Sequence, residues 1–241
     1  MLRDYFHKPA VLRLILCCHA IRATPNESNC LEYYARARKA LIRADLLTPS
    51  TDLIISCQYI FLLARDYNQP ALGQHFLQIA ARMVKELALD VDPDDSPDSL
   101  VKLMIPRKKE ERRRIFWSFY EVLTSNAAVS PSYTKLDISG DSVKAPSQVL
   151  DPHSVFRSDN VVHHTANIFN LIASIKQAWA ATPLSISDVF NMITDSCLRD
   201  QFDIVITSIP QQYLLLSETL FSDINIEGHD IFNKSKPPTH M

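Results

Sequence analysis

Glycine is almost missing from this 241-residue sequence, which contains three glycines, Gly73, Gly140 and Gly228. An average chain is about 7% glycine. Two-residue hairpins, dinucleotide-binding turns and phosphate-binding loops need glycine where the backbone takes a positive φ or approaches a ligand closely. Three widely spaced glycines therefore exclude those motifs and argue against a β-fold rich in hairpins.

The 14 prolines divide the chain into intervals of helix length. Proline lacks a backbone donor and clashes with the preceding turn, so helices tend to begin after it and to end before it. Apolar residues recur in most intervals at helical spacing, and the clearest stripe is Leu72, Phe76, Ile79, Met83 and Leu87. We predict an all-α fold, built as an antiparallel array of helix pairs. About eight helices are expected, over residues 10–23, 28–47, 51–67, 70–89, 108–129, 160–181, 187–208 and 211–223.

The sequence predicts a single domain over residues 1–232 and a flexible tail over residues 233–241. With 46% hydrophobic residues, a chain of this length can bury a sizeable core. Residues 90–106 contain five aspartates and three prolines and are expected to form a solvated acidic loop. Residues 130–158 are expected to be irregular.

Charge and cysteine usage restrict the possible partners. The formal net charge is -2, and tight binding to nucleic acid by this chain alone would need a basic surplus to neutralise phosphates. The apolar stretch 10–21 is interrupted by Arg13 and His19 and is too short to cross a bilayer, so no membrane contact is expected. The five cysteines are odd in number and lack CxxC spacing, which indicates a reducing, intracellular compartment without a disulfide framework.

One acidic segment partly matches a calcium-binding loop. Asp90, Asp92 and Asp94 match the opening of such a loop, but the required Gly and Glu are Asp95 and Val101 here. A solvated acidic loop is the preferred interpretation of these aspartates.

Two further histidine and cysteine clusters are unsuited to metal binding. Adjacent helical residues point about 100° apart, so neither Cys17-Cys18-His19 nor His163-His164 can converge on one ion without other ligands. The sequence contains no GxSxG, HExxH or paired SxxK motif. We expect no catalytic residue, no metal ligand and no cofactor in this chain; an enzyme with a pocket among its helices is the alternative.

Two charged segments allow more than one interpretation. The basic run 106–114 is expected to begin a helix and to pair with neighbouring helices, with a nuclear-import signal or a phosphate-binding patch as alternatives. Its arginines lie unfavourably near a helix N-terminus, so they should have other partners. Segment 211–232 mixes apolar and acidic residues, and is expected to be a docked amphipathic helix rather than an activation segment.

Four segments together resemble the middle homology region of fungal zinc-cluster transcription factors, also called the fungal-specific transcription factor domain. Residues 33–41 look like its early Y-x-x-A-R helix. Residues 77–92, LQIAARMVKELALDVD, look like its A-x-R-M-A-x-x-L-G-L-x-x-D segment. Residues 110–120, EERRRIFWSFY, look like its E-x-R-R-R-x-W-W-x-L-F segment, and residues 136–146 loosely follow its acidic stretch that ends in V-x-L-P.

The resemblance singles out positions that are expected to be structural, and Trp117 in particular is expected to anchor the core. The alternative for Trp117 is the wall of a ligand pocket. The chain departs from the family pattern where Leu87-Ala88-Leu89 replaces L-G-L. The positions concerned are Arg82, Met83, Leu87, Arg112, Arg113, Arg114 and Trp117.

The resemblance implies a regulatory domain in the nucleus that controls transcription by RNA polymerase II without itself contacting DNA. Its partners would be an attached or separate DNA-binding module and a coactivator or small-molecule effector. The family's zinc cluster needs six cysteines that open with CxxC, so zinc is expected only in an N-terminal DNA-binding module missing from this chain. The alternative is a helical-repeat scaffold that binds other proteins and is unrelated to transcription.

Overall fold

The computed structural model describes residues 2–22, 27–130, 137–146 and 161–180, with isolated positions between 185 and 207. Within these residues every regular element is a helix, which confirms the predicted all-α class. Most of the predicted helix 187–208, the predicted helix 211–223 and the tail 233–241 lie outside the described residues. The helices are α1 Leu2–His7, α2 Ala10–Arg22, α3 Glu27–Ile42, α4 Thr51–Asp66, α5 Pro70–Glu86, α6 Ser99–Lys102, α7 Pro106–Val129 and α8 Val161–Ala180.

The chain divides into two compact units, Met1–Ala178 and Trp179–Met241. Almost all of the second unit lies outside the described residues, so the eight helices belong to the first unit apart from the last residues of α8. The prediction of a single domain over residues 1–232 stays a prediction.

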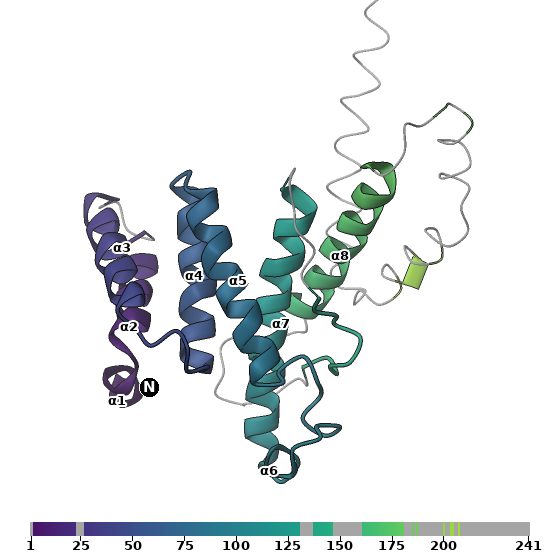
Figure 1. Cartoon of the computed structure of the whole chain (residues 1–241), viewed down its shortest axis with the longest axis horizontal. Helices are drawn as coiled ribbons and strands as arrows, with labels where there is room; N and C mark the ends of the chain where they lie inside the picture. The colour runs from purple at the N-terminus through teal and green to yellow at the C-terminus, as the bar shows by residue number, and fades with distance from the viewer. Residues whose placement is uncertain are drawn as a thin grey trace, which may run out of the picture. The chain divides into compact units, whose positions relative to one another are not determined.

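Consecutive helices of the first unit pack in pairs, α2 against α3 and α4 against α5 (Figure 1). Only residues 67–69 connect α4 to α5, so the two helices run antiparallel. Helix α4 also contacts α2, α3 and α7, and it buries residues around much of its circumference, including Ile54, Cys57 and Phe61. A helix that is apolar on several sides is typically enclosed by others. Helix α4 is therefore the centre of a core to which α2, α3, α5 and α7 also contribute.

Local sequence signals set both ends of α4. The Ser50 hydroxyl accepts a hydrogen bond from the Leu53 backbone N–H at 3.2 Å, as expected for an N-cap serine. At the other end Asn68 takes a left-handed conformation with φ of 56°. The Gln69 N–H then bonds to the Ala64 carbonyl at 2.7 Å and closes a Schellman motif, in which asparagine is second only to glycine.

Helix α5 ends in the same motif, but with a less suitable residue. The Leu89 N–H bonds to the Val84 carbonyl at 2.9 Å, and Ala88 takes the left-handed position with φ of 47°. A side chain with Cβ costs roughly 1–2 kcal/mol there, which glycine avoids. The residue at which this chain departs from the L-G-L pattern is thus the residue whose backbone favours glycine.

The structure corrects the expectation that residues 90–106 form a solvated loop. Asp92 is fully buried and Ser96 is 1% exposed, while residues 99–102 form α6. The Asp98 side chain caps α6 by accepting from the Leu100 N–H at 2.8 Å. The short helix α1 was also missing from the prediction, because six residues hold too few turns to give a periodic signal.

We predict that Ala88→Gly raises the free energy of unfolding by about 1 kcal/mol, because it removes the left-handed strain at the end of α5. Denaturant unfolding of the full chain measures the change. The matched control is Ala35→Gly on the exposed side of α3, which should lower stability by about 1 kcal/mol through lost helix propensity. A loss of stability in both variants would contradict this account of Ala88.

Candidate functional site

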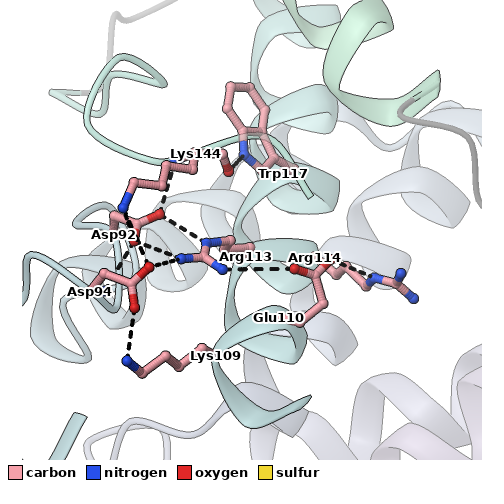
Figure 2. Close-up of polar contacts among 8 residues, drawn as sticks. All are labelled: Asp92, Asp94, Lys109, Glu110, Arg113, Arg114, Trp117 and Lys144. Carbon is pink, nitrogen blue, oxygen red and sulfur yellow. Dashed lines mark hydrogen bonds and ion pairs between the residues drawn. The ribbon is translucent and has the colours of Figure 1, made fainter. Parts of the chain in front are cut away.

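A buried carboxylate, that of Asp92, is the centre of the most connected polar group in the described residues (Figure 2). Its Oδ2 accepts from Arg113 Nε at 2.9 Å and from the Lys144 backbone N–H at 3.0 Å. Its Oδ1 accepts from Arg113 Nη2 at 2.8 Å and from the Asp94 backbone N–H at 3.0 Å. These four bonds use the acceptor capacity of an ionised carboxylate.

Three further charged residues surround this pair. Arg113 Nη2 also reaches Asp94 Oδ2 at 2.7 Å, and Lys109 Nζ lies 2.8 Å from Asp94 Oδ1. Lys144 Nζ lies 3.3 Å from Asp94 Oδ2 and 3.5 Å from Asp92 Oδ1. We call Asp92, Asp94, Lys109, Arg113 and Lys144 the Asp92 cluster.

The Asp92 cluster joins three parts of the chain that are distant in sequence. Asp92 and Asp94 belong to the loop after α5, and Lys109 and Arg113 belong to the first turns of α7. Lys144 belongs to segment 137–146, which is also joined to the loop by the Asp92 N–H bond to the Ser142 carbonyl at 3.0 Å. The cluster therefore fixes the path of two irregular segments over one helix.

Trp117, one turn after Arg113 in α7, also binds segment 137–146. It is 2% exposed, and its indole Nε1 donates to the Lys144 carbonyl at 2.9 Å (Figure 2). Its ring lies 4.3 Å from the ring of His163 in α8, in an edge-to-face arrangement. A Cβ at Gly140 would lie 2.9 Å from Trp117 Cη2 and 3.0 Å from Tyr120 Cε1, so a side chain there would collide with both rings.

Arg112 makes a second contact between α7 and the end of α5. Its Nη2 donates to the Leu87 carbonyl at 2.6 Å and lies 3.5 Å from the Ala88 carbonyl. These carbonyls belong to the Schellman motif, where a cation also interacts favourably with the helix dipole. The prediction that the arginines have partners other than their own helix start is met for Arg112 and Arg113.

The other positions singled out by the resemblance do not contact the Asp92 cluster directly, although Glu110, the partner of Arg114, also lies 3.8 Å from Arg113 Nη1. Met83 is fully buried in α5 and Leu87 is half-buried at its C-cap. Arg82 is exposed; it donates to the Leu46 carbonyl and lies 3.6 Å from Glu86. Arg114 Nε donates to Oε1 of the buried Glu110 at 3.2 Å.

The contacts determine the charge state of the Asp92 cluster. Burial alone would raise the pKa of Asp92, but hydrogen bonds from Arg113 and from two backbone N–H groups hold it well below its usual range. Hydrogen bonds from Lys109 and Lys144 lower the pKa of Asp94 to about 2. The hydrogen bonds that Arg113 donates, first of all to Asp92 and then to Asp94, raise the pKa of its guanidinium. Asp92, Asp94 and Arg113 are therefore held in their charged forms at neutral pH.

The geometry around Asp92 suits a structural role, in which it joins two irregular segments to α7, and does not suit proton transfer. A general base needs a pKa near the working pH and a free lone pair, and Asp92 has neither. Its oxygens face cations and N–H donors, which contradicts the expectation that this carboxylate is solvated. Across the described residues no three His, Cys, Asp or Glu side chains gather as metal ligands, and no helix there is long and apolar enough to span a membrane.

Sequence reasoning missed Asp94, Lys109 and Lys144 as parts of one group. The alternation of Asp90, Asp92 and Asp94 is plain in the sequence, but a solvated loop accounts for it equally well. The available signal was the proximity of two oppositely charged runs in the chain, residues 90–98 and 107–114. Such runs can neutralise each other if the chain turns back between them, as it does at α6.

Comparison with protein-family models, with curated proteins and with solved structures finds no match.

We predict that Asp92→Asn lowers the free energy of unfolding by about 3–5 kcal/mol, because it removes the buried charge that contacts Arg113 through both oxygens. The Arg113 side chain, which is only 12% exposed, then keeps the partly exposed Asp94 as its nearest counter-charge. Asp95→Asn is the matched control, since Asp95 is 70% exposed and lies 3.7 Å from Lys144. It should cost less than about 0.5 kcal/mol. Equal losses in the two variants, measured by urea unfolding, would contradict the special role of Asp92.

We also predict how this difference depends on pH. Asp92 and Asp94 have lowered pKa values in the folded state, so their contribution is complete above the unfolded-state value of about 3.9 and is lost as the pH falls below it. The stability gap between the parent and Asp92→Asn should be constant from pH 7 to pH 5 and should narrow between about pH 4 and pH 2. A gap that stays unchanged over the lower range would show that folding does not lower the pKa of Asp92.

Proposed function

We propose that this chain is the regulatory domain of a nuclear transcription factor of the fungal zinc-cluster type. In this role it controls transcription by RNA polymerase II through contacts with an effector, a partner or its own DNA-binding module, and catalyses no reaction. Zinc and the contacts with DNA would belong to that module. The residues that carry the resemblance are the starting point for this proposal.

One observation supports it above the others. The two most specific segments of the resemblance, residues 77–92 and 110–120, are joined through their own signature positions: Arg112 bonds to the Leu87 carbonyl, and Arg113 bonds to Asp92. The segment of looser resemblance, residues 136–146, joins them through the Lys144 N–H bond to Asp92. Motifs that are far apart in sequence but meet in space have a common physical reason to occur together.

The arrangement also suits regulation by contact. The Asp92 cluster holds two loops on one helix, and all four of its bonds to the Asp92 carboxylate are made in this arrangement. A partner that binds the loops in another position must therefore break several of these charged hydrogen bonds at once. An effector that binds one arrangement better than the other would shift the balance between them. The alternative, a helix-pair scaffold unrelated to transcription, is favoured by the consecutive pairs α2/α3 and α4/α5.

A reporter experiment separates the two proposals. The full chain is fused to a heterologous DNA-binding module in a fungal cell that carries the matching reporter. We expect transcription to differ several-fold from that of the module alone, and Asp92→Asn to change the output. Arg107→Ala, on the exposed N-terminal turn of the same helix, should leave it unchanged.

Fusion protein levels are measured by immunoblot so that loss of folding is distinguished from loss of regulation. Output equal to that of the module alone, at equal protein level, would contradict the regulatory proposal and favour the scaffold.

The chain by itself should bind duplex DNA only non-specifically, with a Kd of roughly 10⁻⁴ to 10⁻⁶ M at physiological salt. The physical reason is its net charge of -2, which offers few uncompensated cations for phosphates. Fluorescence anisotropy with a specific and a scrambled duplex measures this. Nanomolar binding that depends on sequence would overturn the assignment of a regulatory domain that does not contact DNA.

A further inference from the structure

Two buried thiols from neighbouring helices lie against each other, away from the Asp92 cluster. Cys18 of α2 is 0% exposed, Cys30 of α3 is 1% exposed, and their Sγ atoms are 3.1 Å apart. Cys18 Sγ lies 3.3 Å from the Cys30 carbonyl, and Cys30 Sγ lies 3.4 Å from the Cys18 carbonyl. The Tyr67 hydroxyl, at the end of α4, donates to Cys30 Sγ at 3.0 Å.

This reciprocal contact distinguishes the pair from the other described cysteines. Cys57 is buried in α4, where a thiol behaves as a small apolar side chain. Cys17 Sγ lies 3.2 Å from the Tyr5 hydroxyl. The sulfur atoms of Cys18 and Cys30, in contrast, need to approach by only about 1 Å to reach the length of a disulfide bond.

We propose that Cys18 and Cys30 are a site of reversible oxidation, at which a peroxide converts the two thiols into an intramolecular disulfide that ties α2 to α3. The two residues are 12 apart in sequence, and residues 23–26 connect their helices. The bond closes a short loop over the α2/α3 pair. This proposal does not depend on the proposed role in transcription.

The chemistry balances with a peroxide as the oxidant. One thiol loses its proton, and its sulfur attacks an oxygen of hydrogen peroxide; the O–O bond breaks and a sulfenic acid and water result. The second sulfur, after losing its proton, attacks the sulfenic sulfur and displaces hydroxide, which leaves as water. Two thiols and one peroxide thus give one disulfide and two waters, with two electrons passing from the sulfurs to the peroxide.

Burial makes this oxidation slow. Burial, followed by the hydrogen bond with Cys30, raises the pKa of Cys18 to about 12, so little thiolate is present at neutral pH. Brief exposure to oxidant should leave the pair reduced, whereas prolonged exposure, during which α2 and α3 separate transiently, should oxidise it. A thiol reductant should reduce the disulfide again, at a rate limited by the same transient separation of α2 and α3.

The test uses the full chain in the Cys17→Ser background, incubated with excess hydrogen peroxide, unfolded in an alkylating agent and digested with trypsin. Cleavage after Arg22 places Cys18 and Cys30 on different peptides, so a disulfide appears in mass spectrometry as a linked pair that is lighter by two hydrogens. We expect this linked pair to be the main oxidation product and to disappear on reduction. We also expect the oxidised protein to melt roughly 5–10 °C above the reduced form.

Two control variants identify the site. Cys57→Ser should still form the linked pair, and Cys30→Ser should form none and show no rise in melting temperature. The proposal is overturned if Cys18 and Cys30 remain alkylatable after prolonged incubation, when the peroxide has oxidised other thiols or methionines of the chain to completion. It is also overturned if the main product is a disulfide between two molecules, seen as a dimer on a non-reducing gel, or if the linked pair forms without raising the melting temperature.

Discussion

The ion pair between Asp92 and Arg113 is the interaction on which the irregular part of this structure depends. Removing a carboxylate and a guanidinium from water is costly, and the cost is offset only when geometry is good and the remaining acceptors are occupied. Both conditions hold, because Arg113 contacts both oxygens of Asp92 and two backbone N–H groups complete the shell. Since one of those N–H groups belongs to Lys144, the ion pair also fixes segment 137–146.

The helices contribute by placing these groups, and α7 contributes most. Its successive turns present Lys109, Arg113 and Trp117 to the two irregular segments, while Phe116 and Phe119 are fully buried in the core. Charge and apolar packing are thus combined on one helix, with the cations in its first turns. Arg112 adds a bond to the end of α5, where the left-handed Ala88 leaves the helix end strained.

The fold was largely predictable because its signals are local. Prolines mark the starts of α5 and α7, and Ser50 caps α4. The stripe from Leu72 to Leu87 predicts α5 itself and contains the buried Phe76 and Met83, whereas Leu72, Ile79 and Leu87 are only partly buried at the edge of the core. The site was not predictable, because it depends on contacts between residues 21 and 52 positions apart. An aspartate-rich loop has the composition of a solvated segment whether or not an arginine from a later helix contacts it. Hydrophobic periodicity does not reveal whether such a contact forms. Short helices such as α6 are missed for the same lack of a repeating signal.

The central claim is that one charged residue of α7 holds two separate loops, and native-state hydrogen exchange of Arg113→Met tests it most directly. In the parent, the amides of Asp94 and Lys144 donate to the Asp92 carboxylate, and the Asp92 amide donates to the Ser142 carbonyl. We expect residues 90–98 and 137–146 to lose protection together in the variant, while the interior amides of α4 and α5 keep theirs. If segment 137–146 keeps its protection when residues 90–98 lose theirs, the two loops are held independently and the account is wrong.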